Sequence, residues 1–125
     1  MWVAVVGSRD YPDWKAVREY VESLPEGTTV VSGGARGVDS WAERAALACG
    51  LDTRIFPADW DQFGKRAGFM RNEMIVECAD LVVAFWDGQS KGTLHSINLA
   101  KRLGKPVEVY VSVPAEGTVS EPSEG

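Results

Sequence analysis

The sequence predicts an α/β domain in which a parallel sheet of about five strands lies between two layers of helices, a three-layer sandwich. Apolar runs and amphipathic stretches alternate from residue 2 to residue 111, which is the pattern of parallel strands joined by helices. The run Leu81–Trp86 is apolar throughout, as is typical of strands buried on both faces. The predicted strand at residues 28–31 leads through a glycine-rich turn into a helix, which is the expected form of a strand-turn-helix unit.

The N-terminal third is predicted to contain two strands and one helix. An apolar strand at residues 2–6 ends at Gly7. Asp13 is a suitable N-cap for a helix at residues 14–24, where apolar residues recur at helical spacing. A Pro-Glu-Gly turn then precedes the strand at residues 28–31.

The middle of the chain is predicted to add a helix at residues 37–49, which Gly50 terminates. A third strand follows at residues 53–56, and residues 59–68 are predicted to form a loop. The next helix is expected at residues 69–79. The apolar face of that helix is predicted to comprise Met70, Met74, Ile75 and Cys78.

After the strand Leu81–Trp86, a helix is predicted at residues 91–103, with Gly104 as its stop signal. Residues 106–111 complete the set as a fifth strand. If the first strand is central with the fourth beside it, the loops after these strands meet at one edge of the sheet.

Composition and charge predict one domain at residues 1–111 and an acidic, disordered tail at residues 112–125. The tail is rich in Ser, Pro, Gly and Glu and has no basic residue, so it lacks the apolar groups that would offset the entropy of ordering. The body has 13 basic and 15 acidic residues, a net charge of −2. That balance argues against nucleic acid as a partner, because binding a phosphate backbone needs a basic surface.

The remaining composition predicts a cytoplasmic protein. The chain has no apolar run of about 18 residues and no basic leader, so neither a membrane span nor a signal peptide is expected. Cys49 and Cys78 each lie in an apolar helical context, which favours buried free thiols over a metal pair. No metal site and no cofactor are predicted.

Polar and glycine-rich loops follow three predicted strands, at residues 7–12, 32–39 and 86–93. Backbone amides at helix starts and glycines that allow close approach favour phosphate binding. The helix at residues 69–79 adds a guanidinium at the rim of the same edge. The predicted ligand-binding residues are Gly7, Ser8, Arg9, Ser32, Gly33, Gly34, Gly37, Asp39, Arg71, Asn72, Gly88, Ser90, Gly92 and Thr93.

Several of these residues have a structural alternative. Asp39 can simply favour the start of its helix, or it can bind a ribose hydroxyl or a base edge. Lys65 and Arg66 are interpreted as a solvated face. Trp60, in a polar loop, is the better of two candidates for stacking on a base. The single histidine, His95, is interpreted as a surface or second-layer residue.

Six motifs in this order resemble the SLOG superfamily, in its YpsA-related branch. They are Gly7-Ser8-Arg9, Ser32-Gly33-Gly34-Ala35-x-Gly37-x-Asp39, Pro57-Ala58-x-Trp60, Gly64 through Gly68, Arg71-Asn72-x-Met74 and Gly88-x-x-x-Gly92-Thr93. The resemblance implies a Rossmann-like fold and the binding of a nucleotide or nucleotide-derived small molecule, such as an ADP-ribose-like ligand or a nucleoside phosphate. It also implies pairing through helices as a homodimer.

The superfamily also contains the Lonely Guy phosphoribohydrolases and the DprA single-stranded DNA binders. Where those enzymes carry a catalytic glutamate, three residues after the threonine, this chain has Ser96. A serine does not accept a proton as a carboxylate does near neutral pH, so binding without catalysis is the favoured interpretation. The alternatives are a nucleotide N-glycosidic hydrolase, with Asp10, Asp39 or Asp87 as the carboxylate and Arg71 beside it, and DprA-like DNA binding.

Overall fold

The computed structural model describes residues 1–113 and contains one five-stranded, all-parallel sheet with the order β3-β2-β1-β4-β5. The strands are β1 (Trp2–Gly7), β2 (Thr29–Ser32), β3 (Asp52–Ile55), β4 (Leu81–Trp86) and β5 (Val107–Val111). The helices are α1 (Trp14–Glu22), α2 (Val38–Ala48), α3 (Trp60–Phe63), the 3₁₀ turn η1 (Gly64–Arg66), α4 (Ala67–Cys78) and α5 (Lys91–Arg102). The predicted α/β, Rossmann-like architecture is confirmed.

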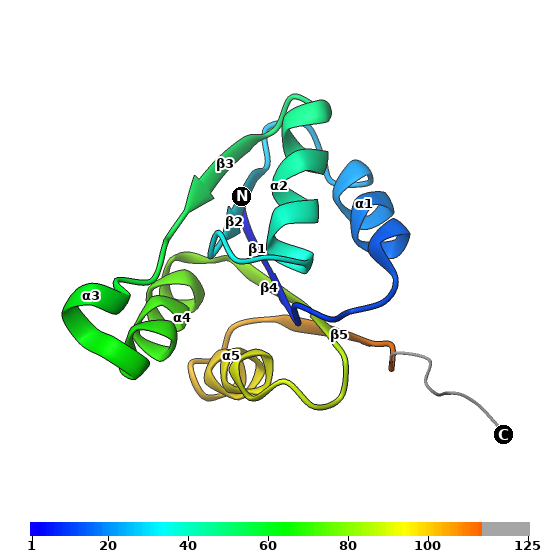
Figure 1. The fold of residues 1–125 in the computed structure, drawn as a ribbon. Coiled ribbons are helices and arrows are strands. Elements are labelled where there is room, and N and C mark those ends of the chain that lie inside the picture. The colour runs from blue at the N-terminus through cyan, green and yellow to red at the C-terminus, as the bar shows by residue number, and fades with distance from the viewer. Residues whose placement is uncertain (114–125) are drawn as a thin grey trace, which may run out of the picture.

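The sheet lies between two layers of helices, α1 and α2 on one face and α4 and α5 on the other (Figure 1). Side chains alternate along β1, as the pleat requires. Val3 and Val5 pack into the core under α1 and α2, whereas Ala4 and Val6 pack into the core under α4 and α5. All four are buried, which explains why the strand is apolar at every position.

The strand order reverses between β1 and β4. β1 pairs with β2 on one side and with β4 on the other, with Val5 opposite Val83 in the β1–β4 register. Chain segments leaving β1 and β4 therefore diverge to opposite faces and leave a crevice at the carboxyl edge. This is the edge at which the predicted polar loops meet.

The prediction of a loop at residues 59–68 is wrong. Asp59 accepts a hydrogen bond from the amide of Gln62 at 3.1 Å and caps α3, and η1 then leads directly into α4, which begins at Ala67. Neither α3 nor η1 has a buried residue. Helices this short show no apolar periodicity, so the sequence pattern could not reveal them.

Two further predictions about burial are wrong. Met74 is 52% exposed, and the buried side of α4 comprises Ala67, Asn72, Ile75 and Val76 instead. Ile75 belongs both to the predicted apolar face and to the observed buried face. In the packed helix the buried face includes Val76 instead of Met74. Cys49, the C-cap residue of α2, is exposed, and Cys78 is partly buried.

Between residues 1 and 113, no helix has the length and hydropathy needed to cross a bilayer. The predicted tail at residues 112–125 lies almost wholly outside the described residues, which end at Val113.

Candidate ligand-binding site

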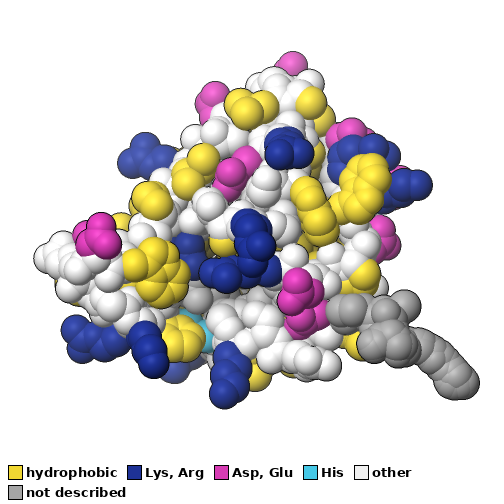
Figure 2. Space-filling view, in the orientation of Figure 1, with side chains coloured by type: hydrophobic (Ala, Val, Ile, Leu, Met, Phe, Trp, Pro, Cys, Tyr) yellow, Lys and Arg dark blue, Asp and Glu magenta, His cyan; other side chains and the backbone are white. Residues whose placement is uncertain are grey.

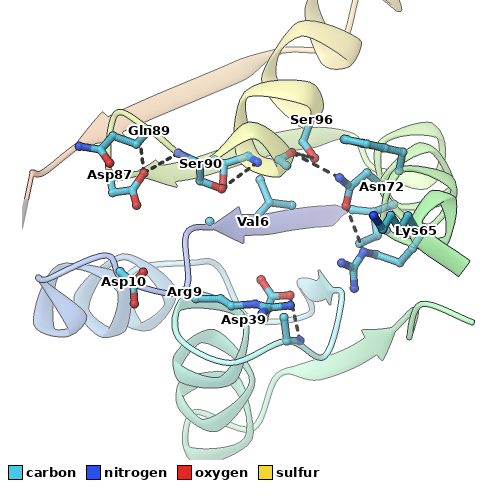
Figure 3. A pocket seen from close by; sticks show the side chains of 18 of the residues that line it. Val6, Arg9, Asp10, Asp39, Lys65, Asn72, Asp87, Gln89, Ser90 and Ser96 are labelled. Atoms are coloured by element: carbon cyan, nitrogen blue, oxygen red, sulfur yellow. Dashed lines mark hydrogen bonds between the residues drawn. The ribbon is translucent and has the colours of Figure 1, made fainter. Parts of the chain in front are cut away.

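A pocket of about 460 Å³ opens at the carboxyl ends of β1 and β4. Its walls come from the β1–α1 loop, the glycine-rich loop entering α2, the segment from α3 to α4, and the β4–α5 loop. In Figure 3, Val6 at the end of β1 lies between Asp39 on one side and Ser90 on the other. Figure 2 shows basic side chains gathered in a hollow at the centre of this face.

The glycine-rich loop is held by an aspartate from the helix that it enters. Asp39, in the first turn of α2, accepts hydrogen bonds through Oδ2 from the amides of Gly33 at 3.2 Å and Ala35 at 3.1 Å. The Gly33 amide belongs to the predicted phosphate cradle, so one of that cradle's donors is already used within the protein. Both roles weighed for Asp39 are compatible with this geometry, because the carboxyl group also lines the pocket.

Burial raises the pKa of Asp39 to about 6, because a charged carboxylate loses hydration there. The amide of Ala35, the nearby Arg71 and the amide of Gly33 each oppose the increase, and Glu43 adds to it. Asp39 therefore changes its protonation state close to neutral pH. Perturbed titration in a pocket is typical of functional carboxyl groups, although loop-stabilising ones share it.

Arg71 ties α4 to the glycine-rich loop. Its Nη1 donates a hydrogen bond to the carbonyl oxygen of Gly33 at 2.7 Å, and its Nε donates to Oδ1 of Asn72 at 3.0 Å. A Cβ at position 33 would lie 2.5 Å from Nη1 of Arg71, which is closer than any real contact. A larger residue at position 33 would therefore displace the Arg71 guanidinium from its present place against the loop.

A second guanidinium enters the same pocket from the β1–α1 loop. Arg9 is exposed, whereas Arg71 is partly buried. Burial lowers the pKa of Arg71, the nearby Arg9 lowers it further, and Asp39 opposes both effects. Over residues 1–113, the one ion pair shorter than 4.0 Å is Arg18–Glu22 on α1, so neither pocket arginine is neutralised by direct pairing.

The β1 and β4 loops are joined by hydroxyl groups. Ser8 is 1% exposed; its Oγ accepts a hydrogen bond from the amide of Asp87 at 3.1 Å and lies 3.3 Å from Oγ1 of Thr93. Ser90 caps α5 by accepting a hydrogen bond from the amide of Thr93. Oδ1 of Asp87 accepts the amides of Gln89 and Ser90 at 2.9 and 2.8 Å. These contacts fix the rim of the pocket before any ligand arrives.

The pKa of Asp87 is lowered, in contrast to that of Asp39. Burial alone would raise it, but the hydrogen bonds from the Gln89 and Ser90 amides and from Ser8 outweigh that effect. Asp87 is therefore charged at neutral pH. In the view of Figure 3, Asp87 and Asp10 lie toward one end and Lys65 and Asn72 toward the other. Asp10 and Asp87 therefore mark an acidic end of the pocket and Lys65 marks the opposite, basic end, with Arg9 between them.

The structure brings most of the predicted residues to this pocket, but not all of them. Those that line it are Gly7, Arg9, Asp39, Arg71, Asn72, Ser90, Gly92 and Thr93, together with the candidate carboxylates Asp10 and Asp87. Those that do not line it are Ser8, Ser32, Gly33, Gly34, Gly37 and Gly88. Ser32 is buried and donates its hydroxyl hydrogen bond to the carboxylate of Glu43, on α2.

Two glycines outside the lining have a supporting role that the structure makes clear. Gly34 and Gly37 have φ angles of 72° and 76°, which side chains rarely adopt. A Cβ at Gly37 would lie 2.6 Å from the carbonyl oxygen of Arg9. Gly37 therefore lets the β1–α1 loop pass against the start of α2, and this contact positions Arg9.

Sequence reasoning missed several lining residues. Lys65, interpreted as part of a solvated face, lines the pocket, as do Phe69 and Gln89. Lys65 and Phe69 reach it because α3 and η1 fold back before α4, and no periodic signal announces those turns. The glycines around Lys65 were the available signal.

Two α5 residues behave differently from each other. Ser96, which the sequence comparison predicts to stand where Lonely Guy enzymes carry glutamate, is 1% exposed, lines the pocket and donates a hydrogen bond to the carbonyl oxygen of Gly92 at 3.3 Å. His95 does not line the pocket but packs edge-on against Phe69, with ring centroids 4.6 Å apart. Its Nδ1 is buried without a hydrogen-bond partner among the described residues. No cluster of three or more metal-ligating side chains occurs within residues 1–113.

The sheet order and this pocket define a Rossmann-like α/β protein with a polar pocket, lined in part by basic side chains, at the strand switch point. The chain belongs to the YspA, cpYpsA-related SLOG family (YAcAr), whose profile matches residues 1–63. The chain is 38% identical over 115 residues to the Gene 61 protein of Mycobacterium phage D29, covering 84% of this chain and 92% of the phage protein.

Two solved structures share the fold. DNA processing protein A (DprA) of Streptococcus pneumoniae superimposes with a TM-score of 0.75 at 24% identity, covering 91% of this chain and 50% of that protein. DprA of Helicobacter pylori, described for its single-stranded DNA binding mode, gives a TM-score of 0.65 at 21% identity, covering 97% and 68%. The chain thus spans about half the length of the first of these proteins.

Proposed function

We propose that this protein binds a nucleotide or a nucleotide-derived small molecule in the pocket at the carboxyl ends of β1 and β4. One observation carries the proposal. Arg9 and Arg71 reach a single pocket from opposite walls, and neither forms an ion pair within residues 1–113. Two unpaired guanidiniums that repel each other in a partly buried site are favourable partners for a phosphate, which each can bind with two hydrogen bonds.

The start of α5 supports the same ligand class. The helix begins beside the pocket, where its N-terminal amides carry partial positive charge. A Cβ added at Gly92, in the first turn, would meet no atom within 4 Å, so a ligand has room to approach the backbone there. The carboxylates Asp10 and Asp87 at the acidic end suit the hydroxyl groups of a sugar.

The charge balance favours a small molecule over a nucleic acid. Residues 1–111 have a net charge of −2, whereas affinity for a phosphate backbone grows with the number of phosphates that basic side chains neutralise. The likeness to the DprA proteins, at 24% and 21% identity, concerns the fold. The two pocket arginines are enough for one or two phosphates.

The test is to identify what the protein carries. The full chain is purified, denatured and analysed by mass spectrometry for released small molecules, in parallel with the Arg9→Ala/Arg71→Ala double variant. We expect a nucleotide-sized anion from the unmodified protein and none from the double variant. Arg36→Ala, an exposed arginine outside the pocket, is the matched control. The proposal is contradicted if the purified protein carries no small molecule and neither nucleoside phosphates nor ADP-ribose raises its melting temperature.

A second candidate is hydrolysis of an N-glycosidic bond, and Asp39 is the observation that favours it. Its carboxyl group lines the pocket and has a pKa of about 6, which suits proton transfer near neutral pH. Its Oδ2, however, is committed to two loop amides. Binding without turnover is therefore the function that we propose first.

A further inference from the structure

Two half-exposed aromatic side chains form one edge of the pocket. Trp60 is 51% exposed and Phe69 is 45% exposed, and both line it. The indole ring lies over Gly68, because a Cβ at that glycine would be 3.2 Å from Cη2 of Trp60. Phe69 is in turn held edge-on by His95. This aromatic edge is therefore positioned by neighbours on α4 and α5 and still presents ring surface outward.

The segment that carries Trp60 contributes nothing to the protein core. α3 and η1 have no buried residue and pack against α4 and each other. In Figure 1, α3 projects beyond α4 on the outer side of the domain. About half of the Trp60 side chain is covered by its neighbours on α4, and the other half is open to contact with another molecule.

The aromatic edge lies next to the basic end of the pocket. Lys65 lies in η1, which directly follows the helix α3 that carries Trp60, and Arg71 follows Phe69 by two residues on α4. A flat apolar surface beside several cations matches a nucleotide, which joins a stacking base to an anionic phosphate. A bare phosphate or a sugar phosphate uses the cations but not the rings.

We propose that Trp60, with Phe69 beside it, is the base-binding residue of this pocket, so that the ligand is a molecule with an aromatic base attached to the phosphate-bearing group. The inference rests on the proposed function, because it assumes that the pocket binds a phosphate ligand. It adds a requirement that the arginines do not impose, namely that the ligand carries a base. Removing the base from the ligand and removing the ring from position 60 should weaken binding to a similar extent.

The experiment compares ligands with and without a base. Binding of AMP, GMP, CMP, UMP and ribose 5-phosphate is measured by calorimetry for the full-length protein and for Trp60→Ala, Trp60→Phe and Arg71→Ala. We expect Trp60→Ala to weaken the best-bound monophosphate by roughly tenfold or more, with ribose 5-phosphate unchanged. Trp60→Phe retains a ring and keeps most of the affinity. Arg71→Ala weakens every ligand, including ribose 5-phosphate.

Trp14 supplies the matched control. It is 45% exposed on α1 and is flanked by Lys15 and Arg18, away from the pocket. Trp14→Ala should leave all affinities unchanged, and far-ultraviolet circular dichroism should show that each variant is folded. Quenching of tryptophan emission by the bound monophosphate should disappear in Trp60→Phe and persist in Trp14→Phe.

The outcomes separate the two proposals. If ribose 5-phosphate binds in an Arg71-dependent way but Trp60→Ala leaves the monophosphates unchanged, the base subsite is overturned and the proposed function stands. Equal losses of affinity for ribose 5-phosphate and for the monophosphates in Trp60→Ala also overturn it. Such losses would show that Trp60 supports phosphate binding or the fold and not the base. If neither this panel nor ADP-ribose binds, both proposals fail. Trp60-dependent binding of an oligothymidylate without binding of the monophosphates assigns the ring to nucleic acid and overturns this inference.

Discussion

The guanidinium of Arg71 donates a hydrogen bond from Nη1 to the carbonyl oxygen of Gly33, across 2.7 Å. The two residues are 38 positions apart in the sequence, and Arg71 lines the pocket whereas Gly33 lies just outside its lining. Arg71 therefore has two tasks: it holds the glycine-rich loop, and it presents the remainder of its guanidinium to a ligand. Substitutions that keep the charge but not the fork of donors separate these tasks.

Arg71→Ala should weaken the binding of a phosphate ligand by roughly 1.5–3 kcal/mol, the usual contribution of a hydrogen bond between charged groups. The affinity of Arg71→Lys should fall between those of the unmodified protein and Arg71→Ala. A lysine ammonium keeps the charge but cannot reproduce the fork of donors that bonds Gly33 and Asn72. Calorimetry with ribose 5-phosphate measures the effect. Arg36→Ala, in the same loop as Gly33 but exposed and outside the pocket, should bind like the unmodified protein. Equal affinity in all four proteins would place the anion elsewhere.

Asp39 should make stability depend on pH. Its pKa is raised from 3.8 to about 6 in the folded state, so the folded protein holds this proton more tightly than the unfolded chain does. The stabilisation from Asp39 is then fully present below about pH 4 and is lost as the pH rises through about 6.

Asp39→Asn removes the titration, while its side-chain oxygen can still accept the Gly33 and Ala35 amides. From pH 4 to pH 7, the free energy of unfolding of the unmodified protein should fall relative to that of the variant by about 2–3 kcal/mol. Urea unfolding at several pH values measures the difference between the two proteins. A difference that stays constant over this range contradicts the raised pKa.

Gly37→Ala should destabilise the fold more than Gly27→Ala does. Both glycines have positive φ angles, 76° and 89°, which side chains rarely adopt, so both substitutions strain the backbone. At Gly27 a Cβ meets nothing within 4 Å, whereas at Gly37 it collides with the backbone of Arg9 at 2.6 Å. Thermal unfolding of the two variants should differ, and Gly37→Ala should also reduce ligand affinity by displacing Arg9. Identical melting temperatures would show that the β1–α1 loop moves aside freely.

The unmodified protein should release no free base from nucleoside monophosphates. Cleavage of an N-glycosidic bond builds positive charge on the sugar, which a nearby carboxylate stabilises. On α5, this chain has Ser96 at the position where the resemblance to the Lonely Guy enzymes predicts a glutamate. The Ser96 hydroxyl donates its hydrogen bond to the carbonyl oxygen of Gly92. Chromatography of reactions with purine and pyrimidine monophosphates, ribo and deoxy, measures the release.

The contrary result would be equally informative. Turnover that Asp39→Asn abolishes, with Asp10→Asn and Asp87→Asn as parallel variants, would make the protein a hydrolase that draws its carboxylate from a different strand end. The low pKa of Asp87 makes it a poor proton donor, so a role for Asp87 would be electrostatic.

The element order and the sheet were predictable from the sequence, because they depend on local and periodic properties. Strands β1 and β4 are apolar at nearly every position, and the Asp13 cap before α1 hydrogen-bonds the amide of Ala16 as expected. Parallel strands with short connections restrict the topology further. Placing the loops after β1, β2 and β4 at one edge followed from that topology and required no side-chain contact.

The direction of individual groups was decided only by tertiary packing. The sequence places Ser8, Ser32 and Gly33 in the right loops, but Ser8 bonds the β4 loop, Ser32 bonds Glu43, and the Gly33 amide bonds Asp39. A buried polar group needs a hydrogen-bond partner, and which group supplies it depends on how the elements pack: Ser8 and Asp87 are 79 positions apart, and even Ser32 and Glu43, 11 apart, meet only because β2 packs beside α2. The sequence by itself therefore determined the fold and the edge that holds the site, and the packed structure determined which of its polar groups stay free for a ligand.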